Sequence, residues 1–142
     1  MKVRITRRDP AVALPARETR GAAGFDLAAS ADLTVAPGEV TLVPTGLIIK
    51  VPDGHFLGIF ARSSTPLKRG LMIPNGVGVV DTDYSGPGDE IKIQVYNFTA
   101  AAVHLKRGDR IAQGIIMPFV APEWDEGEPT SEDRGGFGST GF

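Results

Sequence analysis

The sequence predicts an all-β domain of the β-sandwich or jelly-roll type, and three observations support this fold class. Glycine and proline are abundant, at 18 and 11 of 142 residues, which disfavours long helices and suits frequent turns. Apolar residues recur with a period of two along most of the chain, as they do in half-buried strands. Turn-forming residues interrupt this pattern about every 8–12 residues, the spacing typical of sandwiches and barrels.

Each expected strand is an apolar run bounded by charged or turn-forming residues. In chain order these runs are 3–5, 40–42, 47–49, 56–60, 77–80, 91–96 and 111–117. The turn signals Pro37-Gly38 and Pro52-Asp53-Gly54 bound the second and third runs. A single short helical turn is expected near 66–69, and the sequence contains no tandem repeat.

A change of composition near residue 121 predicts two parts, a single β domain over 1–120 and a flexible C-terminal arm over 121–142. The arm holds six acidic residues and one basic residue, while the domain holds 14 basic and 11 acidic residues. Proline, glycine and hydroxyl residues are common in the arm and large apolar residues are few. Such a segment buries too little surface to offset its ordering entropy, so we expect it to order only on a partner or ligand.

Composition excludes several classes of function. The chain has no cysteine, which rules out disulfides, thiol nucleophiles and cysteine-ligated zinc, and its two histidines leave little for a metal site. Basic residues do not cluster on a face as they would for nucleic acid. No run approaches the roughly 20 apolar residues of a membrane span, and the N-terminus alternates like a strand rather than a signal peptide. We therefore expect a soluble, cytoplasmic protein without nucleic-acid or membrane partners.

Two polar segments that border apolar runs are candidates for chemistry. Asp81 follows the run 77–80 and precedes Tyr84, so it is either part of a surface turn or a strand-end carboxylate able to act as a general base beside a stacking aromatic. Arg62, Ser63 and Ser64 follow the run 56–60. They form either a solvated loop or a set of donors suited to phosphate oxygens.

Two glycine-containing segments are equally open to two interpretations. The segment 108–113 is a turn leading into a strand, with charges that an ordinary hairpin would also carry. The segment 134–141 contains a formal GxGxxG match, but it opens no helix within a βαβ unit, so it is not a dinucleotide fingerprint. It is either an inert end or a strip whose backbone N–H groups wrap a phosphate chain.

Taken together, in this order and at this spacing, the segments resemble the homotrimeric dUTPases. The five matching motifs are AGFDLAA at 23–29, ARSS at 61–64, NGVGVVDTDYSG at 75–86, GDRIAQ at 108–113 and RGGFGSTG at 134–141. The resemblance implies a distorted jelly roll (a dUTPase-like β-clip) that forms a trimer. The three active sites would lie between subunits, each closed by the C-terminal arm of another subunit.

The resemblance also implies a reaction, the Mg²⁺-dependent hydrolysis of dUTP to dUMP and pyrophosphate, which keeps uracil out of DNA and supplies dUMP for dTMP synthesis. Asp81 would deprotonate the water that attacks the α-phosphorus, and Tyr84 would stack under the deoxyribose. Asp26 would reach the Mg²⁺ through water, because the triphosphate itself holds the ion. The remaining substrate-binding residues would be Arg62, Ser63, Ser64, Asn75, Gly78, Val80, Gln113, Arg134, Phe137, Gly138, Ser139 and Thr140.

Two departures and two alternatives accompany this resemblance. The turn after Gly86 is longer than in many family members, and Arg134 directly precedes Gly135-Gly136 although the family usually has intervening residues. The related dCTP deaminases share the fold, and bifunctional deaminase–dUTPases exist. They carry a catalytic Glu where this chain has Gln94, and a neutral amide is not a proton-transferring base. A non-catalytic nucleotide-binding jelly roll is the other alternative.

Overall fold

The computed structural model describes residues 1–136 as an antiparallel β structure with one short helix. In chain order the elements are β1 (Arg4–Arg7), β2 (Phe25–Ala28), β3 (Leu33–Val35), β4 (Val40–Pro44), β5 (Leu47–Lys50), β6 (His55–Ala61), α1 (Ser64–Arg69), β7 (Leu71–Met72), β8 (Gly78–Val80), β9 (Lys92–Asn97), β10 (Val103–Leu105) and β11 (Arg110–Pro118). Each of the seven expected runs overlaps a strand, and the expected helical turn lies within α1. Four short strands, β2, β3, β7 and β10, were not among the predicted runs.

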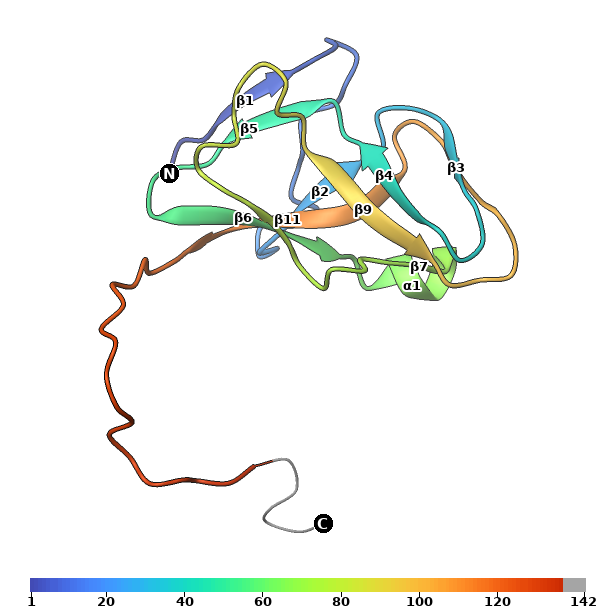
Figure 1. The fold of residues 1–142 in the computed structure, drawn as a ribbon. Coiled ribbons are helices and arrows are strands. Elements are labelled where there is room, and N and C mark those ends of the chain that lie inside the picture. The colour runs from blue at the N-terminus through green and yellow to red at the C-terminus, as the bar shows by residue number, and fades with distance from the viewer. Residues whose placement is uncertain (137–142) are drawn as a thin grey trace.

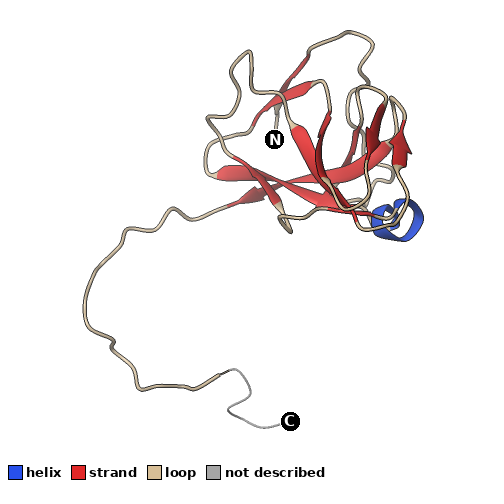
Figure 2. Ribbon diagram, turned by 45° about the vertical axis from the view of Figure 1, so that its right-hand side comes forward, coloured by secondary structure: helices blue, strands red, loops and turns tan. Residues whose placement is uncertain are grey.

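The strands form a four-stranded sheet of order β2-β11-β6-β8 and a three-stranded sheet of order β4-β9-β7. Two further pairs, β1-β5 and β10-β3, complete the domain, and every pairing is antiparallel. Figures 1 and 2 show the strands wrapped around one interior, with the helix at one end. The predicted all-β jelly-roll class is therefore confirmed.

The core is built from alternate residues of strands in both sheets. In β9, Ile93 and Val95 are fully buried while Lys92 points outward, as the two-residue period of a strand requires. In β6, Leu57 and Ile59 are buried from the other sheet. The fully buried large side chains are Leu27, Val35, Val43, Ile49, Val51, Leu57, Leu71, Ile91, Ile93, Val95, Leu105 and Ile111.

The helix α1 ends at a glycine for two physical reasons. Gly70 has φ 66°, a left-handed conformation that closes the last turn, and its N–H donates to Pro66 O at 3.2 Å. A Cβ at Gly70 would also lie 2.1 Å from Thr99 Cγ2, which no side chain tolerates. This tight end places α1 directly beside β7.

The segment after β11 is exposed and contains no helix or strand as far as residue 136. The N–H of Phe119 donates to Gly54 O at 3.0 Å, and beyond this point the chain runs away from the domain (Figures 1 and 2). Within residues 1–136 no helix is long and apolar enough to cross a membrane.

Candidate active site

Five of the residues predicted to bind or act on substrate line one cavity of about 430 Å³. They are Asn75, Gly78, Val80, Asp81 and Tyr84. The cavity lies at the end of β8 and is completed by side chains from β4, β6 and β9. Lys92 and Gln94 of β9 also line it. Gln94 occupies the position at which the related deaminases carry a catalytic Glu, whereas Lys92 belongs to none of the five motifs.

Strand pairing explains why Asp81 projects from the end of β8. Gly78 pairs with Ile59 and Val80 pairs with Leu57, and the ladder stops there, so the next residue leaves the sheet. Val80 is buried and anchors the strand, whereas Asp81 is exposed. The result is a carboxylate held at a fixed strand end and open to water, which is the setting that proton transfer from water needs.

Tyr84 is fixed next to this carboxylate by a turn. Its N–H donates to Asp81 O at 3.3 Å, and its hydroxyl donates to Glu90 O at 3.2 Å. The intervening backbone is held from outside by Lys50, whose Nζ donates to Thr82 O at 2.8 Å. Tyr84 is 41% exposed as a residue, which leaves its ring accessible for stacking on a planar or sugar ligand.

The unusually long turn after Gly86 closes on itself. The N–H of Gly86 donates to Asp89 Oδ2 at 2.6 Å, and the N–H of Asp89 returns to Gly86 O at 3.0 Å. The next residue, Glu90, accepts from Gly46 N at 2.8 Å and pairs with Arg8 at 3.3 Å. These bonds make the turn a compact loop, and Glu90 is anchored separately just before β9 (Lys92–Asn97) begins.

A second cleft, of about 540 Å³, is cationic in its lining. It is lined by Arg62, Ser64, Lys68, Arg69, Gly108, Asp109 and Arg110. Its three arginines also form ion pairs with Asp109 or with the neighbouring Asp26 and Glu18, which balances part of the charge. Arginine and lysine donors suit the oxygens of a phosphate chain. Lys68 was not assigned from the sequence, although its position four residues after Ser64 on α1 places both on one helical face.

Asp109 organises the turn that leads into β11. Arg69 donates to its Oδ2 at 3.1 Å, and this hydrogen bond is the main reason that the pKa of Asp109 lies below its usual value. The N–H of Lys106 also donates to the same oxygen, at 2.9 Å. The carboxylate thus ties α1 to the turn and offsets part of the positive charge in the cleft.

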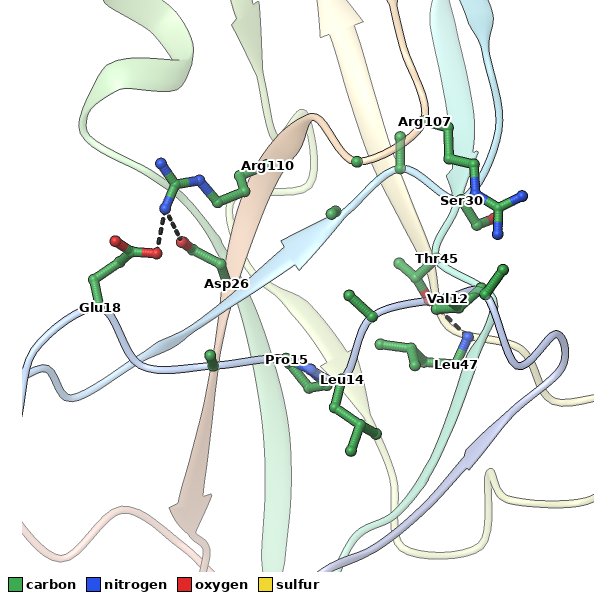
Figure 3. A pocket seen from close by; sticks show the side chains of 16 residues that line it. Val12, Leu14, Pro15, Glu18, Asp26, Ser30, Thr45, Leu47, Arg107 and Arg110 are labelled. Carbon is green, nitrogen blue, oxygen red and sulfur yellow. Dashed lines mark hydrogen bonds and ion pairs between the residues drawn. The ribbon is translucent and has the colours of Figure 1, made fainter.

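Asp26 is clamped between two guanidinium groups. Its Oδ1 accepts from Arg62 Nε at 2.7 Å and its Oδ2 from Arg110 at 3.1 Å, and its side chain is only 14% exposed. Figure 3 shows Glu18 and Asp26 both directed at Arg110. The hydrogen bond from Arg110 lowers the pKa of Glu18, and Glu18 in turn raises the pKa of Arg110.

The same residues close one end of a smaller pocket of about 270 Å³ under segment 11–18 (Figure 3). This pocket shares Gly108 and Arg110 with the cationic cleft. Glu18 was not predicted as a functional residue because it belongs to no recognised motif. Its contact with Arg110 forms only because the segment that precedes β2 folds against the start of β11, far away in the sequence.

Gln113 lies opposite Asp26 in the β2–β11 ladder. Its Nε2 donates to Ala61 O at 3.1 Å, which links β11 to the residue before Arg62. A Cβ on Gly24 would lie 2.8 Å from Gln113 Oε1, so a larger residue at position 24 would force the end of this side chain to shift. Ser63 occupies the N-cap position of α1, where its side chain makes no capping hydrogen bond, and it does not line the cleft.

Asp26 offers a hard oxygen ligand, the type that Mg²⁺ prefers. Within residues 1–136 there is no group of three or more His, Asp or Glu side chains able to enclose a metal ion. Because Asp26 is one carboxylate with both oxygens on arginines, it fits an outer position reached through water rather than a protein cage. The residues therefore fit an Mg²⁺ whose inner ligands come from elsewhere, such as a triphosphate.

The cavity and the cleft use different parts of β6. Asp81 follows Val80, which pairs with Leu57 near the start of β6, whereas Arg62 of the cleft directly follows the end of β6. No residue lines both sites. A single chain therefore presents two separate sites.

The remaining predicted residues belong to the C-terminal arm. Arg134 is exposed on the arm. The expectations for Phe137, Gly138, Ser139 and Thr140 lie outside the residues that the structure describes.

An antiparallel jelly roll with a carboxylate–tyrosine cavity and an arginine-lined cleft defines a β-domain suited to an anionic organic ligand. A model of the dUTPase family matches residues 11–141, and the chain belongs to this family of enzymes. The family predicted from the five motifs is therefore confirmed.

Individual relatives agree with this assignment. The deoxyuridine 5'-triphosphate nucleotidohydrolase of Lactococcus lactis is 43% identical, covering 90% of this chain and 87% of its own length. The crystal structure of dUTPase from Streptococcus mutans is 37% identical with a TM-score of 0.79, covering 87% of this chain and all of that one. A variant dUTPase from phage phi11 of S. aureus, with a structural Mg(II) ion, shares the fold at 20% identity, with a TM-score of 0.82 over 92% of this chain and 99% of that one.

Proposed function

We propose that the chain is a dUTP diphosphatase that hydrolyses dUTP to dUMP and pyrophosphate with Mg²⁺, which keeps uracil out of DNA and supplies dUMP for dTMP synthesis. The observation that carries the proposal is the cavity that joins Asp81 and Tyr84 to the backbone of Asn75, Gly78 and Val80. The substrate named for the Lactococcus lactis relative supports the same conclusion.

Asp81 is the general base in this proposal. Its carboxylate takes a proton from water as the water oxygen bonds to the α-phosphorus. The bond from the α-phosphorus to the bridging oxygen breaks, and pyrophosphate leaves with the electron pair. The exposed strand-end position of Asp81 supports this role, because the attacking water must come within hydrogen-bond reach of the base.

The same cavity supports selection of the nucleoside. The ring of Tyr84 lies beneath the deoxyribose and leaves no space for a 2′-hydroxyl. Its hydroxyl is already bonded to Glu90 O, so the ring is held in one orientation. Backbone groups of 75–84 read the uracil edge, with Asn75, Gly78 and Val80 lining the base.

The cationic cleft supports binding of the triphosphate. Arg62, Ser63, Ser64 and Gln113 bind phosphate oxygens, and Asp26 holds a water of the Mg²⁺ shell. Bound Mg²⁺ supplies neutralisation of charge on the phosphate oxygens. Positioning and charge neutralisation are the main requirements of displacement at phosphorus, so few protein groups are needed. The arm residues assigned to the uracil ring and the γ-phosphate are Arg134, Phe137, Gly138, Ser139 and Thr140.

The protein acts as a homotrimer with shared active sites in this proposal. The separation of the cleft from the Asp81 cavity, which share no lining residue, supports it, because two separate sets of residues can contact one substrate when they come from different subunits. Residues 1–120 form the domain, and 121–142 form a flexible arm that closes the site of a neighbour.

Deamination of dCTP fits the cavity less well. Gln94 lines the cavity at the position where deaminases carry a glutamate, and its amide neither accepts nor releases the required proton. Asn97, three residues later, is fully buried and donates to Val35 O and Ala101 O, so it is a structural residue.

Pyrophosphate release tests the proposal. The natural chain is assayed with dUTP, dCTP, dTTP and UTP, with and without Mg²⁺, alongside Asp81→Asn and the remote surface control Asp53→Asn. We expect release from dUTP alone, dependent on Mg²⁺, and lowered about 10²- to 10⁴-fold by Asp81→Asn only. Comparable turnover of UTP or dTTP would refute the selection argument, and ammonia from dCTP would establish the deaminase.

A further inference from the structure

Glu18 is bound to an arginine of the cationic cleft, although it belongs to none of the five motifs. Arg110 Nη1 donates to Glu18 Oε1 and also to Asp26 Oδ2, so one guanidinium nitrogen serves two carboxylates (Figure 3). Glu18 lies in the segment between β1 and β2, and Arg110 is the first residue of β11. The contact therefore joins a residue outside the motifs to the wall of the cleft.

The two carboxylates on Arg110 are held to different degrees. The side chain of Asp26 is 14% exposed, and Arg62 donates to its second oxygen at 2.7 Å. The side chain of Glu18 is 59% exposed, and Arg110 is the one ion-pair partner that the described residues 1–136 provide for it. An exposed ion pair with a single contact gains little free energy, since water and salt screen it. Glu18 is thus the carboxylate that leaves Arg110 more easily.

The backbone around Glu18 is fixed, which confines its movement to the side chain. Before it, Ala16 O accepts a hydrogen bond from the N–H of Asp26 at 3.0 Å. After it, Thr19 O accepts from the N–H of Ala22 at 3.2 Å. The carboxylate of Glu18 can therefore move away by rotation about side-chain bonds alone, with no rearrangement of the domain.

A carboxylate at this position opposes the binding of an anion in two ways. It occupies a donor of Arg110, whose planar fork suits the paired oxygens of a phosphate group. It also places a negative charge at the edge of a cleft lined by four basic residues and one acidic residue. The hydrogen bond from Arg110 lowers the pKa of Glu18, so this carboxylate is charged at neutral pH.

We propose that Glu18 is a displaceable counter-ion that sets the affinity of the cleft for phosphate chains. The triphosphate of the substrate displaces Glu18 from Arg110, and Glu18 returns to Arg110 when pyrophosphate leaves. Because Glu18 competes for the same donor, it weakens the binding of substrate and product alike and shortens the time for which pyrophosphate stays bound. The proposal rests on the assignment of the cleft to phosphate under the proposed function and gives Glu18 a role that this assignment does not include.

Calorimetric titration with inorganic tripolyphosphate and with pyrophosphate tests the proposal without catalysis. Glu18→Gln removes the charge and keeps the size of the side chain. We expect this variant to bind both anions about two- to fivefold more tightly than the natural chain, the gain that loss of one exposed ion pair permits. The gain should shrink as salt is added, because the competing charge is exposed. An equal or weaker affinity would overturn the proposal, since Glu18 would then have no effect on binding or would orient Arg110 for it.

Asp53→Asn is the matched charge control. It also removes one negative charge, but it precedes β6, whereas Arg62 of the cleft follows the other end of that strand. The seven residues of β6 separate the two positions by about 23 Å, more than twice the distance over which physiological salt screens a charge. Both affinities should stay unchanged. A gain equal to that of Glu18→Gln would show that net charge alone sets the affinity, contrary to the proposal.

A double-mutant cycle shows whether Glu18 acts through Arg110. Arg110→Gln should weaken the binding of both anions, and adding Glu18→Gln to it should give little further change, because the contested donor is gone. A gain of about two- to fivefold in the double variant would refute the competition for Arg110. Urea unfolding shows which variants are folded, and Glu18→Gln alone decides the question if Arg110→Gln is not.

Hydrolysis of dUTP, measured on the same samples, separates this proposal from the proposed function. An active natural chain that binds tripolyphosphate, with no gain in Glu18→Gln, contradicts only the role of Glu18. A natural chain that binds neither anion overturns the proposal, and if it also releases no pyrophosphate from dUTP, the proposed function fails with it. In an active enzyme, Glu18→Gln should lower KM for dUTP without raising kcat, because the competition acts on binding and not on the chemical step.

Discussion

Replacing Gly24 by alanine perturbs the candidate site through one added methyl group. A Cβ at Gly24 would lie 2.8 Å from Gln113 Oε1 and 3.3 Å from Gly114 O. Real Cβ atoms do not approach this closely, so the flexible end of the Gln113 side chain must shift, and we expect its hydrogen bond to Ala61 O to break. Gly24 does not need a left-handed backbone, so alanine introduces no conformational strain of its own.

The expected effect on folding is small and the expected effect on activity is large. Loss of the Gln113–Ala61 hydrogen bond costs about 0.5–1.5 kcal/mol, while replacing glycine by alanine returns roughly 0.4–1 kcal/mol through the unfolded chain. If Gln113 binds phosphate, its displacement removes a hydrogen bond to a charged group, about 1.5–3 kcal/mol. That energy corresponds to roughly a ten- to hundredfold loss of kcat/KM for dUTP.

Steady-state pyrophosphate release and urea unfolding, measured on the same preparation, test whether activity falls while the free energy of unfolding stays nearly unchanged. Gly21→Ala is the matched control, because a Cβ there meets no atom within 4 Å. The reasoning would be refuted if Gly24→Ala retained the kcat/KM of the natural chain, or if Gly21→Ala lost as much.

Three further outcomes follow from the described contacts. Asn97→Ala removes side-chain donors that lie 2.9 and 2.8 Å from two backbone carbonyls, and should lower the unfolding free energy in urea by roughly 2–4 kcal/mol. Arg69 lowers the pKa of Asp109 in the folded protein. The stabilisation by the Asp109 carboxylate is therefore fully present above pH 3.8 and is lost as the pH falls through the pKa of the folded state. The urea midpoint of Asp109→Asn should accordingly fall less at acid pH than the midpoint of the natural chain. Deleting residues 134–142 should leave a folded trimer by light scattering with greatly reduced dUTP hydrolysis, and an unchanged rate would show that this end is inert.

Sequence patterns predicted long strands well and short ones poorly. The nine residues of β11 alternate over enough positions to define a period, and β6 and β9 do so as well. β3 and β10 have three residues each, too few for a period, and they exist because they pair with each other across 70 residues of chain. Such strands are determined by tertiary pairing rather than local propensity.

In the candidate site, too, residues of one continuous motif were predicted, whereas contacts between segments distant in the sequence were not. The segment 75–84 is continuous, so its motif predicted five residues that line one cavity. The ion pair of Asp26 with Arg62 requires β11 to lie between β2 and β6, an order that the sequence does not contain. The partnership of Glu18 with Arg110 was missed for the same reason.

The turn at Gly86 closes on itself, which allows the length of this loop to vary close to Asp81, a residue whose position must stay fixed. Its extra backbone is absorbed by two hydrogen bonds between Gly86 and Asp89, and Glu90 is anchored independently to Gly46 and Arg8. Residues inserted into or deleted from the loop should therefore not displace the backbone outside these contacts. Insertions, deletions and substitutions in this loop can therefore accumulate during evolution while the carboxylate of Asp81 stays at the same position.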